Sequence, residues 1–405
     1  MRLPLVVVWA GLFGCATARP VPPPVQPQGP ASLPAFQLVE TSPVETVLDH
    51  PDLPEAKDVW PEVIARANTR LDLAHFYASN GPGPSLERVI QAIEAAAARG
   101  VAVRFLLEEK FYERYPDTAE RLAKVKGIEV RRFHGKQLVG DILHAKYFLV
   151  DGRQVFQGSQ NFDWRALEHI QELGTLVSEP TVARAFQDVF DTDWALAGGA
   201  DRGFRVRTGG LRFPAAVDAG GETLQVTPVF SPKGVLPDET LWDLPRLVRL
   251  IDSAKRGVRV QLLTYRAEGR DGGPWTELED ALKRAAARGV DVRLLLSHWT
   301  LRDKTLPGLK ALSATPGIQI RIMTIPPWSG GDIPYARVIH AKYLAVDGAR
   351  AWVGTSNWEE DYFTDCRNVG LIFEGPRLTE RLERFFDDGW GGPYTAPLEQ
   401  AARGR

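Results

Sequence analysis

The chain has few cysteines and no excess of charge of either sign. Its 405 residues include two cysteines, and one of them, Cys15, lies in the N-terminal leader. A disulfide framework and a zinc site built from cysteines are therefore excluded. Lysine and arginine total 49 against 51 aspartate and glutamate residues. A protein that coats duplex nucleic acid through overall basicity is thus excluded, although a local basic groove is not.

Long apolar runs are also scarce, because none after the leader reaches the length of a membrane span. The leader itself, "MRLPLVVVWAGLFGCATARP", has a basic residue, an apolar stretch and then Gly14-Cys15. This pattern predicts a secretory signal peptide over residues 1–14, too short to span a membrane as a mature helix. We expect lipidation of Cys15 after cleavage, as in bacterial lipoproteins. Cleavage after Ala18, which would release a free protein, is the alternative.

The segment after the leader is rich in proline. Residues 15–35 contain "RPVPPPVQPQGPASLPA", which predicts a semi-rigid, extended tether. Together, leader and tether predict secretion across the inner membrane of a bacterium. The lipid on Cys15 would then hold the globular part at the cell envelope, in the periplasm or at the outer membrane.

The rest of the chain repeats itself. "AAARGVAVRFLL" at Ala96 returns as "AAARGVDVRLLL" at Ala285, and "LHAKYFLVDG" at Leu143 returns as "IHAKYLAVDG" at Ile339. The order of the elements is kept, which indicates an internal duplication. A glycine-rich seam beginning at Ala197 separates the copies. We predict two homologous halves, residues 36–200 and 201–405.

Each half alternates strands with amphipathic helices. The expected strands are 71–77, 101–107 and 128–133 in the first half and 258–265, 290–296 and 318–323 in the second. The expected helices are 86–99, 117–126, 181–194, 275–288 and 378–390. Hairpins are expected around Asp151-Gly152 and Asp347-Gly348. This predicts an α/β fold of two α-β-α sandwich halves with mixed sheets, related by a pseudo-two-fold axis.

The repeated hairpin carries a set of polar residues. His144 and Lys146 are two apart on a strand and so share a face, whereas Asp151 has the opposite parity and is expected to brace the turn. On the return strand, Ser159 and Asn161 share a face after Gly158. The second half repeats the set, with one threonine in place of serine: His340, Lys342, Asp347, Thr355 and Asn357.

These residue types suit the cleavage of a phosphodiester. Ammonium and amide donors can hold the non-bridging oxygens and stabilise the added charge of a pentacovalent transition state without a metal. One imidazole can attack phosphorus while a second protonates the leaving oxygen and later deprotonates water. Each half then supplies half of one active site at the interface between them.

Two other interpretations were weighed. A single strand histidine is more often structural, and the remaining histidines are interpreted in that way: His50, His75, His134, His169 and His298. The two copies of a five-residue pattern argue against it for His144 and His340. A metal site is disfavoured because only two histidines converge and the second half has no clear carboxylate partner.

The two patterns resemble the paired motifs of the phospholipase D superfamily. The resemblance covers nearly all of the chain after the tether, and "GSQNFDWRALEHIQELG" and "VGTSNWEEDYF" are similar to the vertebrate lysosomal phospholipase D-like branch. Members of that branch are 5′-exonucleases of single-stranded nucleic acid, with a lipid transphosphatidylase activity also attributed to them. The resemblance implies a phosphohistidine intermediate, no metal and no cofactor.

By that resemblance His144 is expected to be the nucleophile and His340 the general acid and base. The motif lysines and aspartates, Lys146, Asp151, Lys342 and Asp347, join the catalytic group, and Ser159, Asn161, Thr355 and Asn357 bind phosphate. The family places a glutamate about eleven residues after the motif asparagine, beside a catalytic imidazole. Glu172 fits this position in the first half, but Asn368 takes it in the second. We expect the second histidine to be oriented by an amide, or by Glu359, Glu360 or Asp361, which suits a proton donor.

Two enzymatic functions and one non-catalytic function follow. The first is a phosphodiesterase for single-stranded DNA or RNA, with candidate stacking residues Trp299, Trp328 and Tyr335 and candidate phosphate contacts Arg131, Arg132, Lys136 and Arg337. The second is a phospholipase D or lipid transphosphatidylase, which a lipid anchor would hold beside its substrate. The third, a tethered binding protein, is disfavoured because both motifs are intact. The sequence leaves the oligomeric state open.

Overall fold

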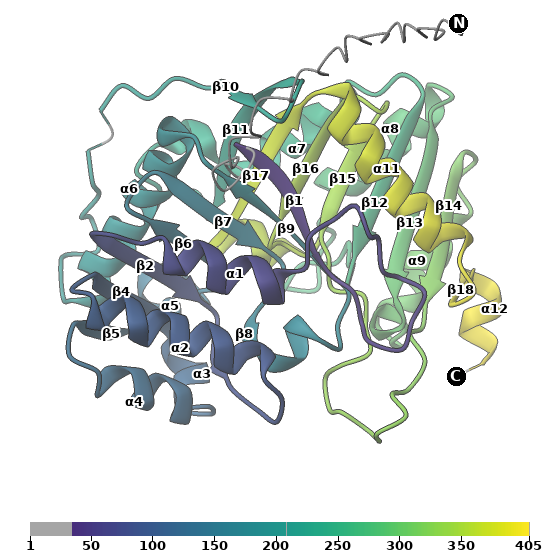
Figure 1. The fold of residues 1–405 in the computed structure, drawn as a ribbon. Helices are drawn as coiled ribbons and strands as arrows, with labels where there is room; N and C mark the ends of the chain where they lie inside the picture. Colours follow the sequence, from purple (N-terminus) through teal and green to yellow (C-terminus); the bar gives the residue numbers. More distant parts are fainter. Residues whose placement is uncertain (1–34, 208, 405) are drawn as a thin grey trace, which may run out of the picture. The chain divides into compact units, whose positions relative to one another are not determined.

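Two large mixed sheets form the framework of the fold (Figure 1). The computed structural model describes residues 35–207 and 209–404. The predicted signal peptide, Cys15 and nearly all of the predicted tether lie outside the described residues. The predicted division near residue 200 falls between helix α6, Pro180–Ala197, and strand β10, Ala215–Asp218.

The sheet of the first half has seven strands in the order β1-β9-β7-β6-β2-β4-β5. Its strands β2, β4 and β5 are parallel, and the others pair antiparallel. The strand bounds, in sheet order, are Phe36–Thr41, Glu172–Val177, Gln154–Gly158, Lys146–Val150, Arg70–His75, Ala102–Glu108 and Ile128–Phe133. Two short strands, β3 (Ala78–Ser79) and β8 (Phe162–Asp163), pair separately.

The sheet of the second half repeats this order. Its nine strands run β10-β11-β17-β16-β15-β12-β13-β14-β18, and the seven from β11 to β14 correspond in order to the first sheet. The bounds after β10 are Thr223–Ser231, Asn368–Glu374, Arg350–Gly354, Tyr343–Val346, Gly257–Leu262, Asp291–Ser297, Ile318–Met323 and Thr395–Pro397. The predicted duplication is thus visible as the same strand order in both halves.

Helices cover the faces of both sheets (Figure 1). In the first half they are α1 to α6, namely Ala56–Ala65, Ser85–Ala98, Glu109–Tyr112, Asp117–Ala123, Gly135–Leu138 and Pro180–Ala197. In the second they are α7 to α12, namely Asp243–Asp252, Glu277–Ala287, Leu306–Ser313, Glu360–Thr364, Pro376–Gly391 and Leu398–Arg403. Short 3₁₀ turns occupy Trp164–Leu167, Glu239–Leu241 and His298–Thr300. The predicted α/β class with mixed sheets is confirmed.

The strands and helices that the periodicity of the sequence predicted lie within three residues of their observed bounds. The strands at 128–133 and 318–323 match their predicted bounds. The helix predicted over 86–99 spans Ser85–Ala98, and Gly100 follows it with φ of 95°, a conformation that favours glycine. Asp151 and Gly152 both have positive φ, 52° and 64°, as a type I′ turn requires, and they lie where a hairpin was predicted.

One apolar cluster joins the two halves. It includes side chains from β6 and α6 of the first half and from β15 and α11 of the second. Two equivalent aromatic pairs lie within it, Tyr147 with Phe186 at 5.5 Å and Tyr343 with Phe385 at 5.8 Å between ring centroids. Because the interface is packed like a core, the halves hold the groups between them in fixed positions.

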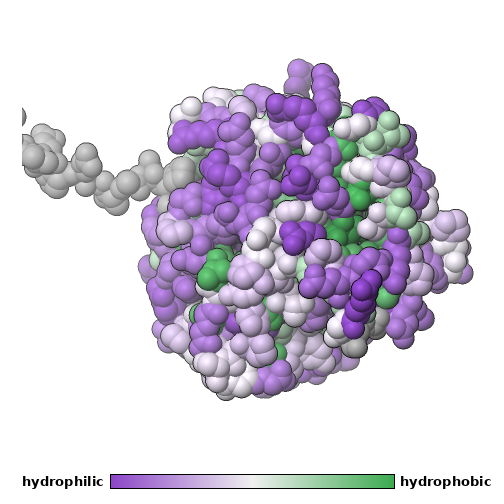
Figure 2. Space-filling view, turned by 90° about the vertical axis from the view of Figure 1, so that its right-hand side faces the viewer, coloured by the Kyte–Doolittle hydropathy of each residue, from purple (hydrophilic) through white to green (hydrophobic). Residues whose placement is uncertain are grey.

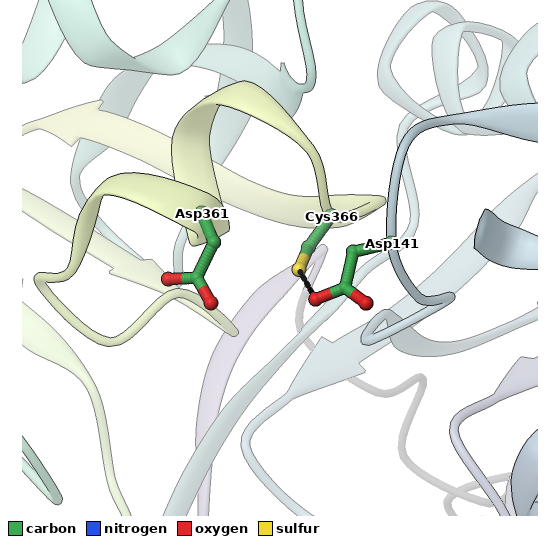
Figure 3. Close-up of side chains that lie close together, drawn as sticks. All are labelled: Asp141, Asp361 and Cys366. Carbon is green, nitrogen blue, oxygen red and sulfur yellow. Dashed lines mark hydrogen bonds between the residues drawn. The ribbon is translucent and has the colours of Figure 1, made fainter. Parts of the chain in front are cut away.

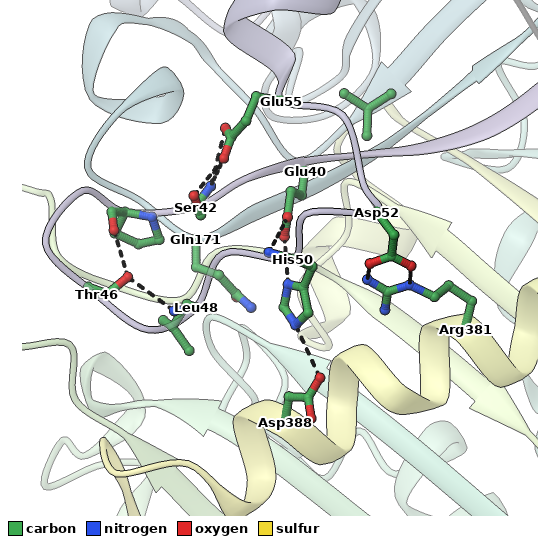
Figure 4. Close-up of polar contacts among 12 residues, drawn as sticks. Glu40, Ser42, Thr46, Leu48, His50, Asp52, Glu55, Gln171, Arg381 and Asp388 are labelled. Atoms are coloured by element: carbon green, nitrogen blue, oxygen red, sulfur yellow. Dashed lines mark hydrogen bonds and ion pairs between the residues drawn. The ribbon is translucent and has the colours of Figure 1, made fainter.

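A strap at the start of the first half crosses to the second (Figure 4). The strap comprises residues 42–55, between β1 and α1. His50 Nδ1 lies 2.9 Å from the buried Glu40 carboxylate and its Nε2 lies 3.5 Å from Asp388 of α11. Asp52 accepts two hydrogen bonds from Arg381, also in α11. These contacts give His50 the structural role that the sequence suggested.

The surface is mainly hydrophilic on the face that Figure 2 shows, with apolar side chains in several separate areas, the largest of them right of centre. Large hydrophobic side chains that are exposed among the described residues are Val47, Phe204 and Tyr335. None of the helices in residues 35–207 and 209–404 combines the length and apolar character that a membrane span requires.

Candidate active site

The two motif histidines meet between the halves, and each is held by the main chain of the opposite half. The His144 N–H donates to the Arg367 carbonyl at 2.9 Å, just before β17. The His340 N–H donates to the Gln171 carbonyl at 2.8 Å, just before β9. Both histidines are buried, 5% and 8% exposed. The site therefore depends on both halves, as the duplication predicted.

The side-chain partners of the imidazoles also cross between the halves. His340 Nδ1 lies 2.8 and 2.9 Å from the carboxylate oxygens of Glu172, which begins β9 of the first half. His144 Nδ1 lies 3.0 Å from Oδ1 of Asn368, which begins β17 of the second half. The expectation that the second histidine has an amide partner is wrong, because position along the chain does not show which imidazole a strand end faces.

The other carboxylates proposed for His340 have different partners. Glu359 accepts from Thr264 Oγ1 at 2.6 Å, and Glu360 accepts from the Arg270 N–H at 2.9 Å. Asp361 pairs with the Arg270 guanidinium at 3.1 Å. The described residues thus give His340 one carboxylate partner, Glu172.

These contacts decide which ring nitrogen of each histidine is available. Carboxylate and amide oxygens accept hydrogen bonds, so Nδ1 carries the proton in both imidazoles. The Asn368 amide is oriented by its nitrogen, which donates to the Tyr362 carbonyl at 2.8 Å. Each neutral imidazole consequently has its lone pair on Nε2.

Two buried lysines lie beside the imidazoles. Lys146 Nζ donates to the His144 carbonyl at 2.5 Å, and Lys342 Nζ has no hydrogen-bond partner among the described residues. Both lysines are fully buried. A buried ammonium without a partner is costly unless an anion joins it. The pair is therefore suited to the non-bridging oxygens of a phosphodiester.

Burial controls the protonation of this site. Burial, assisted by the lysine charges, holds the pKa of both imidazoles well below the ordinary value. Burial lowers the pKa of Lys342 to about 7, against the attraction of Glu172. Burial likewise raises the pKa of Glu172 to about 8, although Lys342 and Lys146 oppose the shift. Adding an anionic phosphate would favour the protonated forms of the lysines and imidazoles.

The motif aspartates lie at the other end of the hairpin strands. Asp151 accepts from the main-chain N–H groups of Thr69 and Arg70 at 2.8 and 2.9 Å, and hydrogen bonds of this kind lower its pKa to about 2 against the opposing effect of burial. Asp347 accepts from the N–H groups of Arg256 and Gly257 in the same way. These contacts agree with the expected bracing role, and the inclusion of both aspartates in the catalytic group stays a prediction.

The hydroxyl groups also have structural partners. Ser159 Oγ exchanges hydrogen bonds with the main chain of Leu173, and Thr355 Oγ1 donates to Asn368 Oδ1 at 2.8 Å. These partners argue against direct binding of phosphate by Ser159 and Thr355, which stays a prediction. Both brace the strands that carry Glu172 and Asn368.

The motif asparagines instead face the substrate space. Asn161 and Asn357 line a cleft of about 240 Å³ together with both histidines. Asn161 Oδ1 is buried without a hydrogen-bond partner in the described part of the chain. These two amides remain predicted ligands of the phosphate.

Aromatic side chains dominate the rest of the cleft. Both halves contribute, with Phe76, Tyr77, Phe111, Tyr115, Trp299, Tyr335 and Tyr362 in its lining. Arg114 lies between two of these rings, 5.4 Å from Tyr115 and 5.7 Å from Tyr335. Arg165 also lines the cleft, neutralised by Asp163. The cleft thus has mainly aromatic walls, and Arg114 and Arg165 are the arginines in its lining.

Of the stacking candidates, Trp299 and Tyr335 line the cleft, whereas Trp328 packs against His169 at 5.0 Å. The basic candidates lie elsewhere. Arg131 contacts Trp194 and Glu129, and Arg132 pairs with Glu109. Lys136 lines a different groove, and Arg337 is buried with its donors on the carbonyls of Pro326 and Val44. Their assignment as phosphate contacts of this cleft is corrected.

Several cleft residues were missed from the sequence. Phe76 and Tyr77 directly follow strand β2, whose end pairs with Lys146. That pairing could have placed both near the histidines, because neighbouring strands end together. Phe111, Arg114 and Tyr115 lie in a helical segment and its loop, and only the tertiary fold brings them to the cleft.

A separate cluster of possible metal ligands bridges the halves (Figure 3). Asp141, Asp361 and Cys366 place three ligand atoms close together, and the Cys366 thiol donates to Asp141 at 3.8 Å. Arg270 pairs with both aspartates. The cluster therefore has its counter-charge within the chain and connects the two halves as an ion-pair network.

Known proteins resemble this chain over both of its halves. A family model described as "Cardiolipin synthase, PLD-like domain" matches residues 61–194 and 247–390, one stretch in each half. Phospholipase D Z of Dictyostelium discoideum is 30% identical over 373 residues, which cover 84% of this chain and 86% of that protein. The 5′-3′ exonuclease PLD3 of Bos taurus is 29% identical over 407 residues, which cover 91% and 83%.

A solved structure supports the fold. Phosphatidylserine synthase of Haemophilus influenzae Rd KW20 superimposes with a TM-score of 0.61 over 86% of each chain, at 13% sequence identity. The family match covers the core of both halves, and the paired histidines sit where both halves meet. The chain therefore belongs to the phospholipase D superfamily and is a phosphodiesterase.

Proposed function

We propose that this chain hydrolyses single-stranded DNA or RNA by a metal-independent mechanism with a phosphohistidine intermediate, cutting from a strand end. The observation that carries this proposal is the aromatic cleft that leads to the paired histidines. Aromatic side chains stack on nucleobases without regard to sequence. The relatives named 5′-3′ exonuclease support the nucleic acid substrate and the attack from an end.

The mechanism has two displacement steps. In the first, Nε2 of one imidazole attacks phosphorus, and the bond to the leaving oxygen breaks as the second imidazole protonates that oxygen. In the second, water attacks phosphorus, its proton passes to the second imidazole, and the phosphorus–nitrogen bond breaks. Lys146 and Lys342 stabilise the charge of both transition states, which supports a mechanism without a metal.

The partners of the imidazoles favour His340 as the nucleophile. A phosphorylated imidazole is cationic, and its charge favours the ionised form of Glu172 against the burial that raises the pKa of this group. The carboxylate can then stabilise that charge while it holds Nδ1–H. Asn368 offers His144 an amide dipole but no charge, which leaves its conjugate acid the stronger proton donor. From the sequence, the histidine with an amide partner was expected to be the proton donor. Because His144 has the amide partner, the same argument now makes His340 the nucleophile and His144 the general acid and base.

A lipid substrate is the alternative. Relatives named phospholipase D support it, and the same two histidines would perform the chemistry. The aromatic lining and the small volume of the cleft favour a nucleotide over a diacylglycerol group.

Parallel assays of the full chain distinguish the two substrates. We expect a 3′-labelled single strand of about 20 nucleotides to be shortened in the presence of EDTA, while phosphatidylcholine and phosphatidylglycerol vesicles release no head group. Trp299→Ala with Tyr335→Ala should raise KM for the oligonucleotide about tenfold or more, since stacking contributes about 1–3 kcal/mol per base. Cleavage of bis(p-nitrophenyl) phosphate, which needs no stacked base, is the matched control. Head-group release without oligonucleotide cleavage would refute the proposal.

Activity should depend on pH with an optimum below about 6.5, the ordinary pKa of histidine. The general acid must carry a proton and the nucleophile must not, and the pKa of both imidazoles is lowered by burial. As pH rises through the lowered pKa of the acid, its protonated fraction and the rate fall. Measuring kcat/KM between pH 4 and 9 checks this. A maximum above pH 7.5 would contradict it.

The predicted leader and tether complete the proposal. A lipid on Cys15 would keep the enzyme at the bacterial cell envelope, where it would meet nucleic acid outside the cytoplasm. Metabolic labelling with a radioactive fatty acid tests this, and we expect Cys15→Ser to abolish the label.

A further inference from the structure

Tyr362 lies beside the reacting groups without a counterpart in the other half. It follows Asn357 by five residues, and the equivalent residue after Asn161 is Ala166. Its ring edge packs on the His144 imidazole, with centroids 4.9 Å apart and planes at 83°. It lines the cleft with both histidines. Tyr362 thus breaks the symmetry of the site on the His144 side.

The hydrogen bonds around Tyr362 fix the direction of its hydroxyl proton. The Thr264 N–H donates to Asn357 Oδ1 at 3.4 Å, so the amide nitrogen of Asn357 faces the Tyr362 hydroxyl, 3.1 Å away. An amide nitrogen can only donate. The hydroxyl oxygen therefore accepts this bond, and its own hydrogen must point elsewhere. No group in the described residues accepts that hydrogen.

The Tyr362 hydroxyl hydrogen therefore points into the cleft, which this side chain lines. Burial raises the pKa of Tyr362, so the hydroxyl remains a donor and does not act as a base. Asn357 differs from Asn161 in giving one of its amide hydrogens to Tyr362. On the His144 side, the hydroxyl consequently offers a donor that the first half lacks.

We propose that the Tyr362 hydroxyl donates a hydrogen bond to one non-bridging oxygen of the bound phosphodiester and so distinguishes the two non-bridging oxygens. This rests on the two-histidine mechanism proposed above. No proton is transferred, because the hydroxyl stabilises the charge that this oxygen gains in the transition state. Lys146, Lys342 and the motif asparagines occur once in each half and distinguish the two oxygens less. Arg165, which lines the cleft from the first half alone, is paired with Asp163 and donates to the Pro334 carbonyl.

Phosphorothioates test the proposal. Thymidine p-nitrophenyl phosphodiester is compared with its two phosphorothioate diastereomers, each of which has sulfur in place of one non-bridging oxygen. Sulfur is a weak acceptor, so the wild type should cleave one diastereomer more slowly than the other. Tyr362→Phe should lower kcat for the oxygen ester roughly a hundredfold, and should bring the rate ratio of the two diastereomers about tenfold closer to one.

This ratio separates contact with substrate from a positioning role. The Tyr362 carbonyl, which orients Asn368, and the ring on His144 remain in Tyr362→Phe. Tyr77→Phe is the matched control, because Tyr77 lines the same cleft but donates its proton to Asp163 at 2.7 Å. It should leave the diastereomer ratio as in the wild type.

An unchanged ratio in Tyr362→Phe would overturn the proposal, whether or not kcat falls. Tyr362→Met repeats the measurement if the phenylalanine variant does not fold, as judged by its circular dichroism. The small ester also keeps this test independent of the strand substrate. If the wild type cleaves the ester but no oligonucleotide, the proposed nuclease function fails while the role of Tyr362 is still measured.

Discussion

His144→Ala should accumulate a covalent phosphohistidine on His340, whereas His340→Ala should form none. Both variants should lose activity on an oligonucleotide by a factor of roughly a thousand or more, because removing one member of a catalytic unit disables the whole unit. The trapped species, and not the loss of rate, distinguishes the two roles.

The reason is that His144 has a different task in each step. A p-nitrophenyl ester has a leaving group that needs no proton, so His340 can still attack phosphorus when His144 is absent. Hydrolysis of the intermediate needs a base to deprotonate water, and the alanine variant lacks it. Attack therefore continues after hydrolysis has slowed, and the enzyme stops at the covalent stage.

Mass spectrometry of the intact protein measures the outcome. The His144→Ala variant is mixed with thymidine p-nitrophenyl phosphodiester and quenched in alkali, in which phosphohistidine is stable. We expect the mass of one nucleotidyl group on the protein and a burst of about one nitrophenol per enzyme. An adduct in His340→Ala and none in His144→Ala would reverse the roles and return the nucleophile to His144.

Glu172→Gln should lower kcat about a hundred- to ten-thousandfold, by analogy with the loss of a carboxylate behind a catalytic histidine elsewhere. Glutamine can hold the His340 ring, but it removes the negative charge that stabilises a phosphorylated imidazole. It can also present its amide nitrogen to Nδ1 and so select the wrong tautomer. Steady-state kinetics measure the effect on thymidine p-nitrophenyl phosphodiester and on the oligonucleotide. We expect kcat to fall for both substrates.

Glu40→Gln is the matched control. Glu40 is a buried carboxylate that lies 2.9 Å from His50 Nδ1 in the strap (Figure 4), a contact like that of Glu172 with His340. The control should change the melting temperature and leave kcat within about twofold, since a rate effect needs contact with the reacting groups. Equal losses of kcat in the two variants would mean that Glu172 acts on folding alone.

Much of the fold could be predicted from the sequence, because periodicity and turn chemistry are local. The alternation at Ile128–Phe133 and the glycine after the helix at 85–98 depend on neighbours along the chain. Asp151-Gly152 adopts positive φ for the same reason. Comparison of the repeated stretches at Leu143 and Ile339 revealed the duplication. The duplication in turn predicted a single site formed by both histidines.

The partners of the site residues could not be read in this way. Glu172 was correctly expected beside an imidazole, but it contacts His340 in place of His144. The serine and threonine of the motifs have suitable chemistry for phosphate, yet their hydroxyls are occupied by neighbouring strands. Spacing along the chain sets which residues share a face, and it contains no information on which face of the other half lies opposite.

The sequence by itself determined the chemistry of this protein: one imidazole, one ammonium group and one amide, a set that occurs twice at matched spacing in an α/β duplication. Only the tertiary structure decided which partner each histidine has, and with it the role proposed for each. The side chains at the starts of β9 and β17, Glu172 and Asn368, cross to the histidines of the opposite halves, so a carboxylate contacts His340 and an amide contacts His144. The crossing arises from packing between the halves, where apolar burial sets their relative position. That packing gives two histidines with the same sequence motif different hydrogen-bond partners.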